Sequence, residues 1–395
     1  MIPEIIFWAC IGLILLPYIG YPLILAILSI FWPRRPIPET TDWPSISVLI
    51  SAFNAQDEIC GKIHNVLDSD YPADKLEVIV CSDGSTDGTN RLVEQYGDER
   101  VLLAASPKNI GKNATMALGA AIAKGQLLLL VDYNEMLDKG AIRAAARHFA
   151  DPKVGIVTGR IEHLNPMKTS VGSGYRAYWM IEDGVRLLES RLGLGVVVLG
   201  SFEMIRREAY LPVPSEFSND MGAPLYAHSK GYLCRYEPAA WQSAVQRKNP
   251  QQEFARRLRM VVRAWSSIPY LLSIVPFWKN VGNWLALLCH KYMRWLTWVF
   301  MIGLLVTNAI LADCGDFWTH GWDTFSSNAS FYRVFMAVQL AAYAMALAGW
   351  LLARAGIRVK LLSMPFFFCL LQTAACKGFF QSLAGKKIGT WKIED

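Results

Sequence analysis

The chain lacks several features that mark common protein classes. Its eight cysteines show no C-x-x-C spacing, which argues against a zinc site or a disulfide framework and suits a reducing compartment. It has no internal repeat and no low-complexity segment. Charge is also scarce, since 18% of the 395 residues are charged whereas 53% are hydrophobic. This balance is unusual for a purely soluble protein, so part of the chain is expected to lie in lipid.

The longest uncharged stretch lies near the N-terminus. Residues 5–32 contain no Asp, Glu, Lys or Arg, which is enough to cross a bilayer of roughly 30 Å. A signal peptide is the alternative, but the start lacks a basic region and no small-residue cleavage site follows. The pair Arg34-Arg35 comes directly after the stretch. It predicts that the N-terminus lies outside and the following chain on the cytoplasmic side.

Three more apolar segments follow residue 268. Two of them are expected to span the membrane: residues 284–312, which contain a polar break at 290–294, and residues 335–353. The loop 313–330 contains no Lys or Arg and is expected to face outward. Residues 361–376 are expected to re-enter or to lie at the interface, because a full crossing would place Lys386, Lys387 and Lys392 outside. The predicted organisation is an N-terminal membrane helix (1–35), a cytoplasmic catalytic domain (36–267), an interfacial segment (268–282), a membrane region of two to three helices (283–385) and a tail (386–395).

The net charge of +6 does not indicate nucleic-acid binding. Much of the basic excess lies in residues 247–263 and beside the apolar segments. There it suits anionic lipid on the cytoplasmic side and phosphorylated ligands.

Between residues 43 and 263 strand-like and helix-like segments alternate. Short apolar runs predict strands at 46–50, 76–80, 101–103 and 126–131, and the segments between and after them predict helices at 57–68, 87–96, 112–123 and 139–149. This alternation is typical of an α/β domain whose sheet is mostly parallel, with helices on both faces.

Four acidic clusters occur in order along this domain: Asp57-Glu58, Asp83, Asp132 and Asp220. Asp83 and Asp132 each follow a predicted buried strand. They are therefore expected at the carboxyl edge of the sheet, where ligands bind in open α/β folds.

Each candidate also has a purely structural interpretation. Asp83 could belong to a turn and Asp220 to a helix cap, whereas strand-end carboxylates can instead accept hydrogen bonds from a nucleoside. Asp132 and Asn134 could end a strand or hold Mg²⁺ or Mn²⁺ against a diphosphate. Lys112, at a helix start, could be solvated or contact a phosphate.

Two further segments have comparable alternatives. Asp220 lies in a predicted loop before residues 225–230 and could take the proton of an attacking hydroxyl. Residues 256–263 carry Arg256, Arg257, Arg259 and Arg263, which could bind a membrane surface or a leaving diphosphate.

Together these motifs resemble the membrane-embedded family 2 glycosyltransferases of the GT-A fold, the group of hyaluronan, chitin, cellulose and poly-N-acetylglucosamine synthases. The resemblance covers about residues 44–300. Residues 51–58 (SAFNAQDE) match the P-A-Y-N-E-E turn, 82–87 (SDGSTD) the D-D-G-S-T-D turn and 109–112 (NIGK) the N-x-G-K loop. Residues 132–134 fall on D-x-D, and Asn219-Asp220 on the position of the catalytic base.

The resemblance implies a role for each matching position. Nucleotide-sugar contacts would come from Ala52, Asn54, Glu58, Asp83, Lys112, Asp132 and Arg259. Asp132 and Asn134 would hold Mg²⁺ or Mn²⁺, and Asp220 would be the general base. The metal would neutralise the departing nucleoside diphosphate while the acceptor attacks from the opposite face and inverts the anomeric centre.

The chain departs from the family pattern at three positions. Ser82 replaces an Asp, Asn134 ends the D-x-D motif, and Met260 stands where processive synthases have the Trp of Q-x-x-R-W. Met260 and the segment with Glu203 are expected on the acceptor side. The loss of the Trp removes an aromatic platform for the acceptor sugar and weakens the prediction of a long polymer.

The predicted function is transfer of a sugar, expected to be UDP-linked, to a saccharide or lipid-linked acceptor at the cell (inner) membrane, in cell-surface or exopolysaccharide synthesis. The alternatives are transfer of one sugar to a lipid carrier, and an inactive membrane scaffold of an export complex. The expected partners are the donor, the acceptor and membrane lipids. The sugar, the linkage and the oligomeric state stay open.

Overall fold

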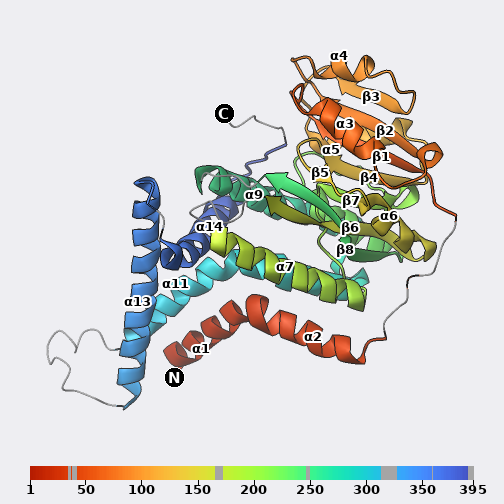
Figure 1. Ribbon diagram of the computed structural model, residues 1–395. Helices are drawn as coiled ribbons and strands as arrows, with labels where there is room; N and C mark the ends of the chain where they lie inside the picture. The colour runs from red at the N-terminus through yellow and green to blue at the C-terminus, as the bar shows by residue number, and fades with distance from the viewer. Residues whose placement is uncertain are drawn as a thin grey trace.

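The computed structural model describes residues 1–33, 37, 42–164, 172–245, 250–312, 327–357 and 359–389. An α/β domain and a group of long helices make up the molecule, with helices α7 (Gly172–Leu192) and α9 (Pro250–Ile274) between them (Figure 1). The predictions that rest on Arg34, Arg35, Lys392 and most of the loop 313–330 concern residues outside this description.

The domain contains one eight-stranded sheet with the strand order β3-β2-β1-β4-β7-β6-β8-β5. Its strands are β1 (Ile46–Ala52), β2 (Leu76–Asp83), β3 (Val101–Ser106), β4 (Leu127–Asp132), β5 (Met136–Leu137), β6 (Val154–Leu164), β7 (Phe202–Arg206) and β8 (Leu233–Val245). The first four in the order are parallel, and β6 is parallel to β8. By contrast, β7 is antiparallel to both of its neighbours and β5 to β8. The prediction of an α/β fold with a mostly parallel sheet is confirmed.

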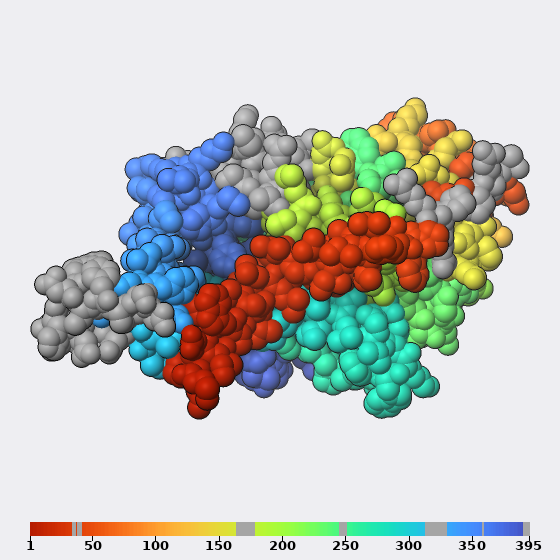
Figure 2. Space-filling view, turned by 90° about the horizontal axis from the view of Figure 1, so that it is seen from below, coloured from red at the N-terminus to blue at the C-terminus, as the bar shows by residue number. Residues whose placement is uncertain are grey.

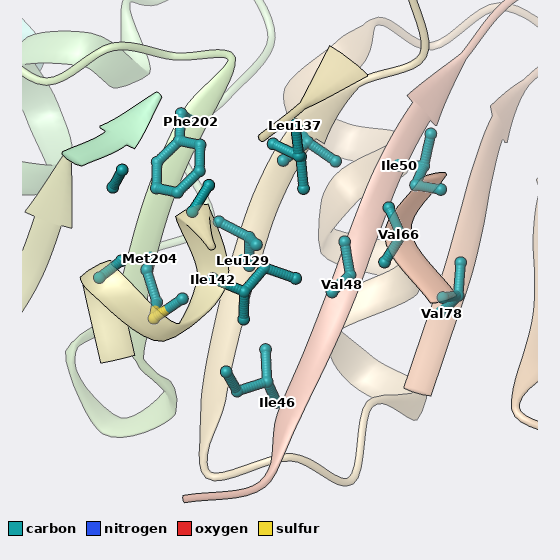
Figure 3. Close-up of a cluster of buried hydrophobic side chains, with 14 of the residues drawn as sticks. Ile46, Val48, Ile50, Val66, Val78, Leu129, Leu137, Ile142, Phe202 and Met204 are labelled. Carbon is teal, nitrogen blue, oxygen red and sulfur yellow. The ribbon is translucent and has the colours of Figure 1, made fainter. Parts of the chain in front are cut away.

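Alternate residues of the strands pack on opposite faces of the sheet, as the period of two requires. Ile46, Val48 and Ile50 of β1 belong to one core, together with Val66 of α3 (Ile59–Leu67) and Ile142 of α6 (Ala141–Ala146) (Figure 3). Leu49 belongs to the core on the other face, with residues of α5 (Lys112–Ile122) and α8 (Asn219–Ser229). Burial of these aliphatic side chains, at about 25 cal/mol per Å² of apolar surface, holds the layers together.

The helices of the domain start close to their predicted positions. They are α3 (Ile59–Leu67), α4 (Thr89–Glu94), α5 (Lys112–Ile122), α6 (Ala141–Ala146, continued by a 3₁₀ turn at Arg147–Ala150) and α8 (Asn219–Ser229). One expectation was wrong, because Asp220 lies in the first turn of α8 and not in a loop before it. The cap position belongs to Ser218.

Four helices are long and apolar enough to cross a membrane: Ile2–Phe31, Val281–Leu311, Ser330–Arg354 and Lys360–Leu383. The first consists of α1 (Ile2–Leu15), a π turn (Leu16–Gly20) and α2 (Tyr21–Phe31), and it lies across one face of the molecule (Figure 2). The second consists of α10 (Val281–Leu287), a π turn (Leu288–Tyr292) and α11 (Met293–Leu311). The other two belong to α13 (Ser327–Arg354) and α14 (Lys360–Leu383).

The polar break predicted at 290–294 falls on the π turn between α10 and α11. His290, Lys291 and Arg294 are each less than a tenth exposed. Their charges therefore face protein and not lipid, which is where ionisable groups at membrane depth are tolerated.

The segment after α14 returns to the α/β domain. Ile388 and Gly389 lie beside the N-terminus of α5, and the Lys387 ammonium is 3.7 Å from the Glu216 carboxylate. Lys387 thus lies beside the α/β domain. The expectation that the last apolar segment re-enters or lies at the interface stays a prediction, since its helix is long and apolar enough to cross a membrane.

Candidate active site

A cavity of about 310 Å³ lies between the carboxyl edge of the sheet and the helices α7, α8, α9 and α11. Five of the residues selected from the sequence line it: Lys112, Asp132, Asp220, Arg259 and Met260. They come from segments as far apart as residues 112 and 260, so only the tertiary fold brings them together. In the part of the chain that the structure describes, the other selected residues lie outside the lining: Ala52, Asn54, Glu58, Asp83, Asn134 and Glu203.

Asp132 ends β4 and lies at the centre of a polar cluster. Its Oδ1 accepts hydrogen bonds from the Ser51 hydroxyl at 2.7 Å and from the ammonium of Lys112. The same ammonium donates to the carbonyl oxygen of Gly200 at 2.9 Å. Lys112 thereby joins the end of β4 to the loop before β7.

Asp83 is buried at the end of β2 and holds the loop that leads into α5. Its carboxylate accepts hydrogen bonds from the backbone N–H groups of Ile110 and Gly111 and from the hydroxyl of Thr115. The three donors lie within 3.1 Å. Asp83 therefore fixes the position from which Lys112 reaches the cavity.

Asn54 follows β1 and connects it to the turn after β2. It has a positive φ of 49°, and its side-chain oxygen accepts a hydrogen bond from the N–H of Thr86 at 2.8 Å. Ala52 is buried as the last residue of β1, whereas Glu58 is exposed at the start of α3. These three residues lie outside the lining of the cavity.

Asp220 projects into the cavity beside the backbone of Gly200. A methyl group added at Gly200 would lie 2.3 Å from Asp220 Oδ1, so glycine is required for this close approach. Asp220 lies close enough to Glu203 of β7 for their charges to interact. Burial, and then the charge of Asp220, raises the pKa of Glu203 to about 8, so Glu203 is mostly protonated at neutral pH.

Glu135 lines the same cavity, although the sequence did not single it out as a site residue. Its carboxylate accepts a hydrogen bond from the amide of Gln242. Burial and the nearby charge of Asp132 raise the pKa of Glu135. A divalent cation would relieve this repulsion between two carboxylates, and oxygen ligands are those that Mg²⁺ and Mn²⁺ prefer.

The residues present therefore fit a metal that takes some ligands from the chain and the rest from a bound phosphate. No group of three His, Cys, Asp or Glu side chains placed to hold a metal occurs among the described residues. A site with few protein ligands suits Mg²⁺, which usually keeps waters and substrate phosphates. Asn134, the second residue of the motif, is exposed next to this cluster.

Helix α9 supplies most of the positive charge of the cavity. Arg256, Arg257, Arg259 and Arg263 line it together with Met260. Arg263 also donates to the carbonyl oxygen of Phe217 at 2.6 Å, which ties α9 to the loop before α8. Guanidinium groups at this density suit a phosphorylated ligand.

Sequence reasoning missed the contribution of α7. Tyr178, Trp179, Glu182 and Arg186 line the cavity from this helix, and Trp295 does so from α11. Residues 178, 182 and 186 recur at helical spacing and share one face, which was the available signal. Aromatic side chains thus line the cavity from elements other than the one that carries Met260.

The whole chain is similar in structure to the mannosyltransferase PcManGT from Pyrobaculum calidifontis, determined in complex with GDP-Man and Mn²⁺. The TM-score is 0.68 at 19% sequence identity, over 97% of this chain and 99% of that one. Together with the mixed sheet and the cavity at its carboxyl edge, this likeness defines a GT-A fold. The prediction of that fold, with apolar helices at both ends, is confirmed.

Residues 47–211 match the family model described as Glycosyl transferase family 2. This match confirms the prediction of a family 2 glycosyltransferase domain for that segment of the chain.

Curated relatives agree with this family. An N-acetylglucosaminyltransferase of Mesorhizobium japonicum is 28% identical over 225 residues, 53% of each chain. A poly-beta-1,6-N-acetyl-D-glucosamine synthase of Staphylococcus aureus is 24% identical over 215 residues, 52% of this chain and 51% of that protein. The chain thus spans about half the length of these relatives.

Proposed function

We propose that this protein is an inverting, metal-dependent glycosyltransferase. It transfers a sugar from a UDP-linked donor to a saccharide or lipid-linked acceptor at the cytoplasmic face of the inner membrane, in cell-surface or exopolysaccharide synthesis. The observation that carries the proposal is the convergence of Lys112, Asp132, Asp220 and Arg259 on one cavity. The names of the relatives support N-acetylglucosamine as the transferred sugar.

In this proposal each residue has a distinct task. Asp132 and the neighbouring Asn134 would hold Mg²⁺ or Mn²⁺, and the metal would supply positive charge against the diphosphate of the donor. Lys112 exchanges its contact with Asp132 for the donor phosphates, and Arg259 binds the diphosphate from the opposite wall. Asp220 takes the proton of the acceptor hydroxyl.

The nucleoside side of the site is proposed from the motif positions. Ala52, Asn54 and Glu58 would border the nucleoside, and Asp83 would hold the loop that closes around it. Glu203 and Met260 belong to the acceptor side, where protonated Glu203 limits the negative charge around Asp220.

The proposal is tested with purified protein in nanodiscs and a panel of radiolabelled nucleotide sugars. Asp220→Asn is expected to lower nucleoside diphosphate release at least about 100-fold, since loss of a catalytic proton acceptor typically costs that much. Asp132→Ala is expected to lower it as well, because the change removes a metal ligand. EDTA should abolish the activity and Mn²⁺ or Mg²⁺ should restore it. Asp68→Asn is the matched control, because the Asp68 carboxylate is 65% exposed on the surface.

Product size distinguishes the alternatives. A ladder of products indicates a polymer synthase, whereas one added sugar indicates transfer to a lipid carrier. Wild-type protein that turns over no donor with either metal would favour the inactive scaffold and refute the enzyme proposal.

A further inference from the structure

A second cavity adjoins the catalytic cavity on its membrane side. Its volume is about 180 Å³, and it is lined by residues of α7, α9, α11 and α14 and of the π turns at residues 16–20 and 288–292. Tyr178, Arg257, Lys291 and Trp295 line both cavities. A ligand in the second cavity would therefore end close to the space that contains Asp220.

The walls of this second cavity are mainly apolar. Ile181 of α7 and Met364, Phe367 and Leu371 of α14 contribute to them. Ile181 is 41% exposed and Met364 is 55% exposed. Both belong to the surface beside helices long enough to cross a membrane, so in a bilayer the rim of the cavity would meet hydrocarbon.

Positive charge exceeds negative charge where the two cavities adjoin. The buried carboxylate of Glu182 accepts hydrogen bonds from Lys291 and, at 2.8 Å, from Arg294. Arg186 lies 3.3 Å from the same carboxylate. Three buried cations thus share one carboxylate, and burial of the remaining charge is costly.

The buried carboxylate of Glu189 does not compensate this charge. Glu189 is engaged by His290, 2.9 Å away, and by the Tyr21 hydroxyl at 2.7 Å. Within the described residues, Nε and Nη2 of Arg294 have no hydrogen-bond partner, although Arg294 is only 6% exposed. Nε and Nη1 of buried Arg186 likewise have no hydrogen-bond partner among the described residues. These nitrogen atoms are buried, so the guanidinium charge of Arg294 in the wall of the second cavity is only partly compensated, and an anionic oxygen ligand in that cavity would balance it.

We propose that the second cavity binds a lipid phosphate, with the phosphate at Arg294 and Lys291 and the hydrocarbon chain between α7 and α14. This inference rests on the proposed glycosyltransferase function and gives the acceptor its chemical class. The phosphate source is a lipid and not free phosphate, because the cations adjoin an apolar space that faces the bilayer.

The transfer step balances with such an acceptor. A phosphate oxygen forms a bond to the anomeric carbon of the donor sugar as the bond from that carbon to the donor diphosphate breaks. The nucleoside diphosphate leaves with the electron pair, and any proton on the acceptor phosphate passes to Asp220. The product is a sugar joined to the lipid through a phosphodiester.

The test measures binding of tritiated farnesyl phosphate to the protein in phosphatidylcholine nanodiscs, without any nucleotide sugar. Farnesol, inorganic phosphate and pyrophosphate are the competitors, and each should compete at least about tenfold less well, because each lacks either the charge or the chain. Arg294→Gln should weaken binding about tenfold for the loss of charge-assisted hydrogen bonds. Ile181→Trp should weaken it by narrowing the rim, whereas Lys279→Gln, an exposed cation outside both cavities, should not.

Several outcomes would overturn the inference. Farnesol that competes as well as farnesyl phosphate shows a nonspecific apolar site, and pyrophosphate that competes as well shows a donor phosphate site. If Arg294→Gln does not fold, the inference is still tested by the binding of Ile181→Trp and by the competition experiments on the wild-type protein. Asp220→Asn should bind farnesyl phosphate as the wild type does. A wild-type protein that binds farnesyl phosphate but transfers no sugar refutes only the proposed function. An active enzyme that uses a saccharide and does not bind farnesyl phosphate refutes only this inference.

Discussion

Substitution of Gly200 by alanine tests whether Asp220 acts at the position where the structure holds it. The new methyl group would lie 2.3 Å from Asp220 Oδ1 and 3.2 Å from its Cγ. Such a contact cannot persist, so the carboxylate has to move. The change leaves the charge of the cavity as it was and displaces one candidate catalytic group.

The size of the effect follows from this overlap. An ordinary carbon–oxygen contact is longer by roughly 1 Å, so the carboxylate is displaced by about that amount. A misplacement of about 1 Å can lower a rate roughly 100-fold when the group must align with a reacting atom. We expect a loss of this order in kcat with little change in KM for the donor.

The assay is release of nucleoside diphosphate under saturating donor, with melting temperature measured in parallel. Gly61→Ala is the matched control, since a methyl group there meets no atom within 4 Å. Gly61 lies in helix α3, where alanine is favoured over glycine by about 1 kcal/mol. The control should keep full activity and should not be less stable.

A double variant provides the decisive comparison. In the Asp220→Asn background, Gly200→Ala should cause almost no further loss, because both changes act through the same group. A loss of the same factor in both backgrounds would show that Gly200 acts through something other than Asp220. Full activity of Gly200→Ala alone would refute the reasoning as well.

Three further predictions concern stability. The pKa of Glu203 is about 8 in the folded protein, against an ordinary value of 4.5. Between pH 4.5 and pH 8 the folded state therefore binds a proton that the unfolded state does not. The free energy of unfolding should fall as pH rises through this range, by at most about 1.4 kcal/mol per pH unit. Glu203→Gln should remove this dependence in denaturant titrations at pH 5 to 9; an unchanged slope would contradict it. Burial lowers the pKa of Lys62 to about 8, against 10.5, so stability should rise with pH between 8 and 10.5, and Lys62→Met should flatten that rise. Gly84→Ala should lower the free energy of unfolding by roughly 1–3 kcal/mol. The reason is that φ of Gly84 is +72° and that the new methyl group would lie 2.4 Å from the carbonyl carbon of Lys108. A melting temperature equal to that of the wild type would contradict this prediction.

Local patterns predicted the parallel half of the sheet well. The apolar runs at β1, β2 and β4 are continuous because both faces of these strands are buried, and that pattern can be recognised without any partner. The strands β6, β7 and β8 were not predicted. Buried polar residues such as Thr158, Glu203 and Gln242 interrupt their patterns, and their pairing joins distant segments.

Some residues of the candidate site could likewise be recognised from local sequence, whereas others could be recognised only from their packing. The motifs around Asp83, Asp132 and Asp220 lie next to strand or helix ends, which local sequence marks. Glu135 could have been included, since it lies three residues beyond Asp132. Glu182 and Arg186 read as an ordinary charged helix, because only packing against α9 and α11 shows that they are buried.

The sequence by itself determined the α/β order, the acidic motifs at the sheet edge and the apolar helices at both ends, because each depends on residues close together in the chain. Only the tertiary structure decided which of these groups share a cavity, that α7 and the tail after α14 complete it, and that three cations gather around Glu182 beside an apolar space. Such contacts join segments more than a hundred residues apart, and their burial depends on every layer that covers them.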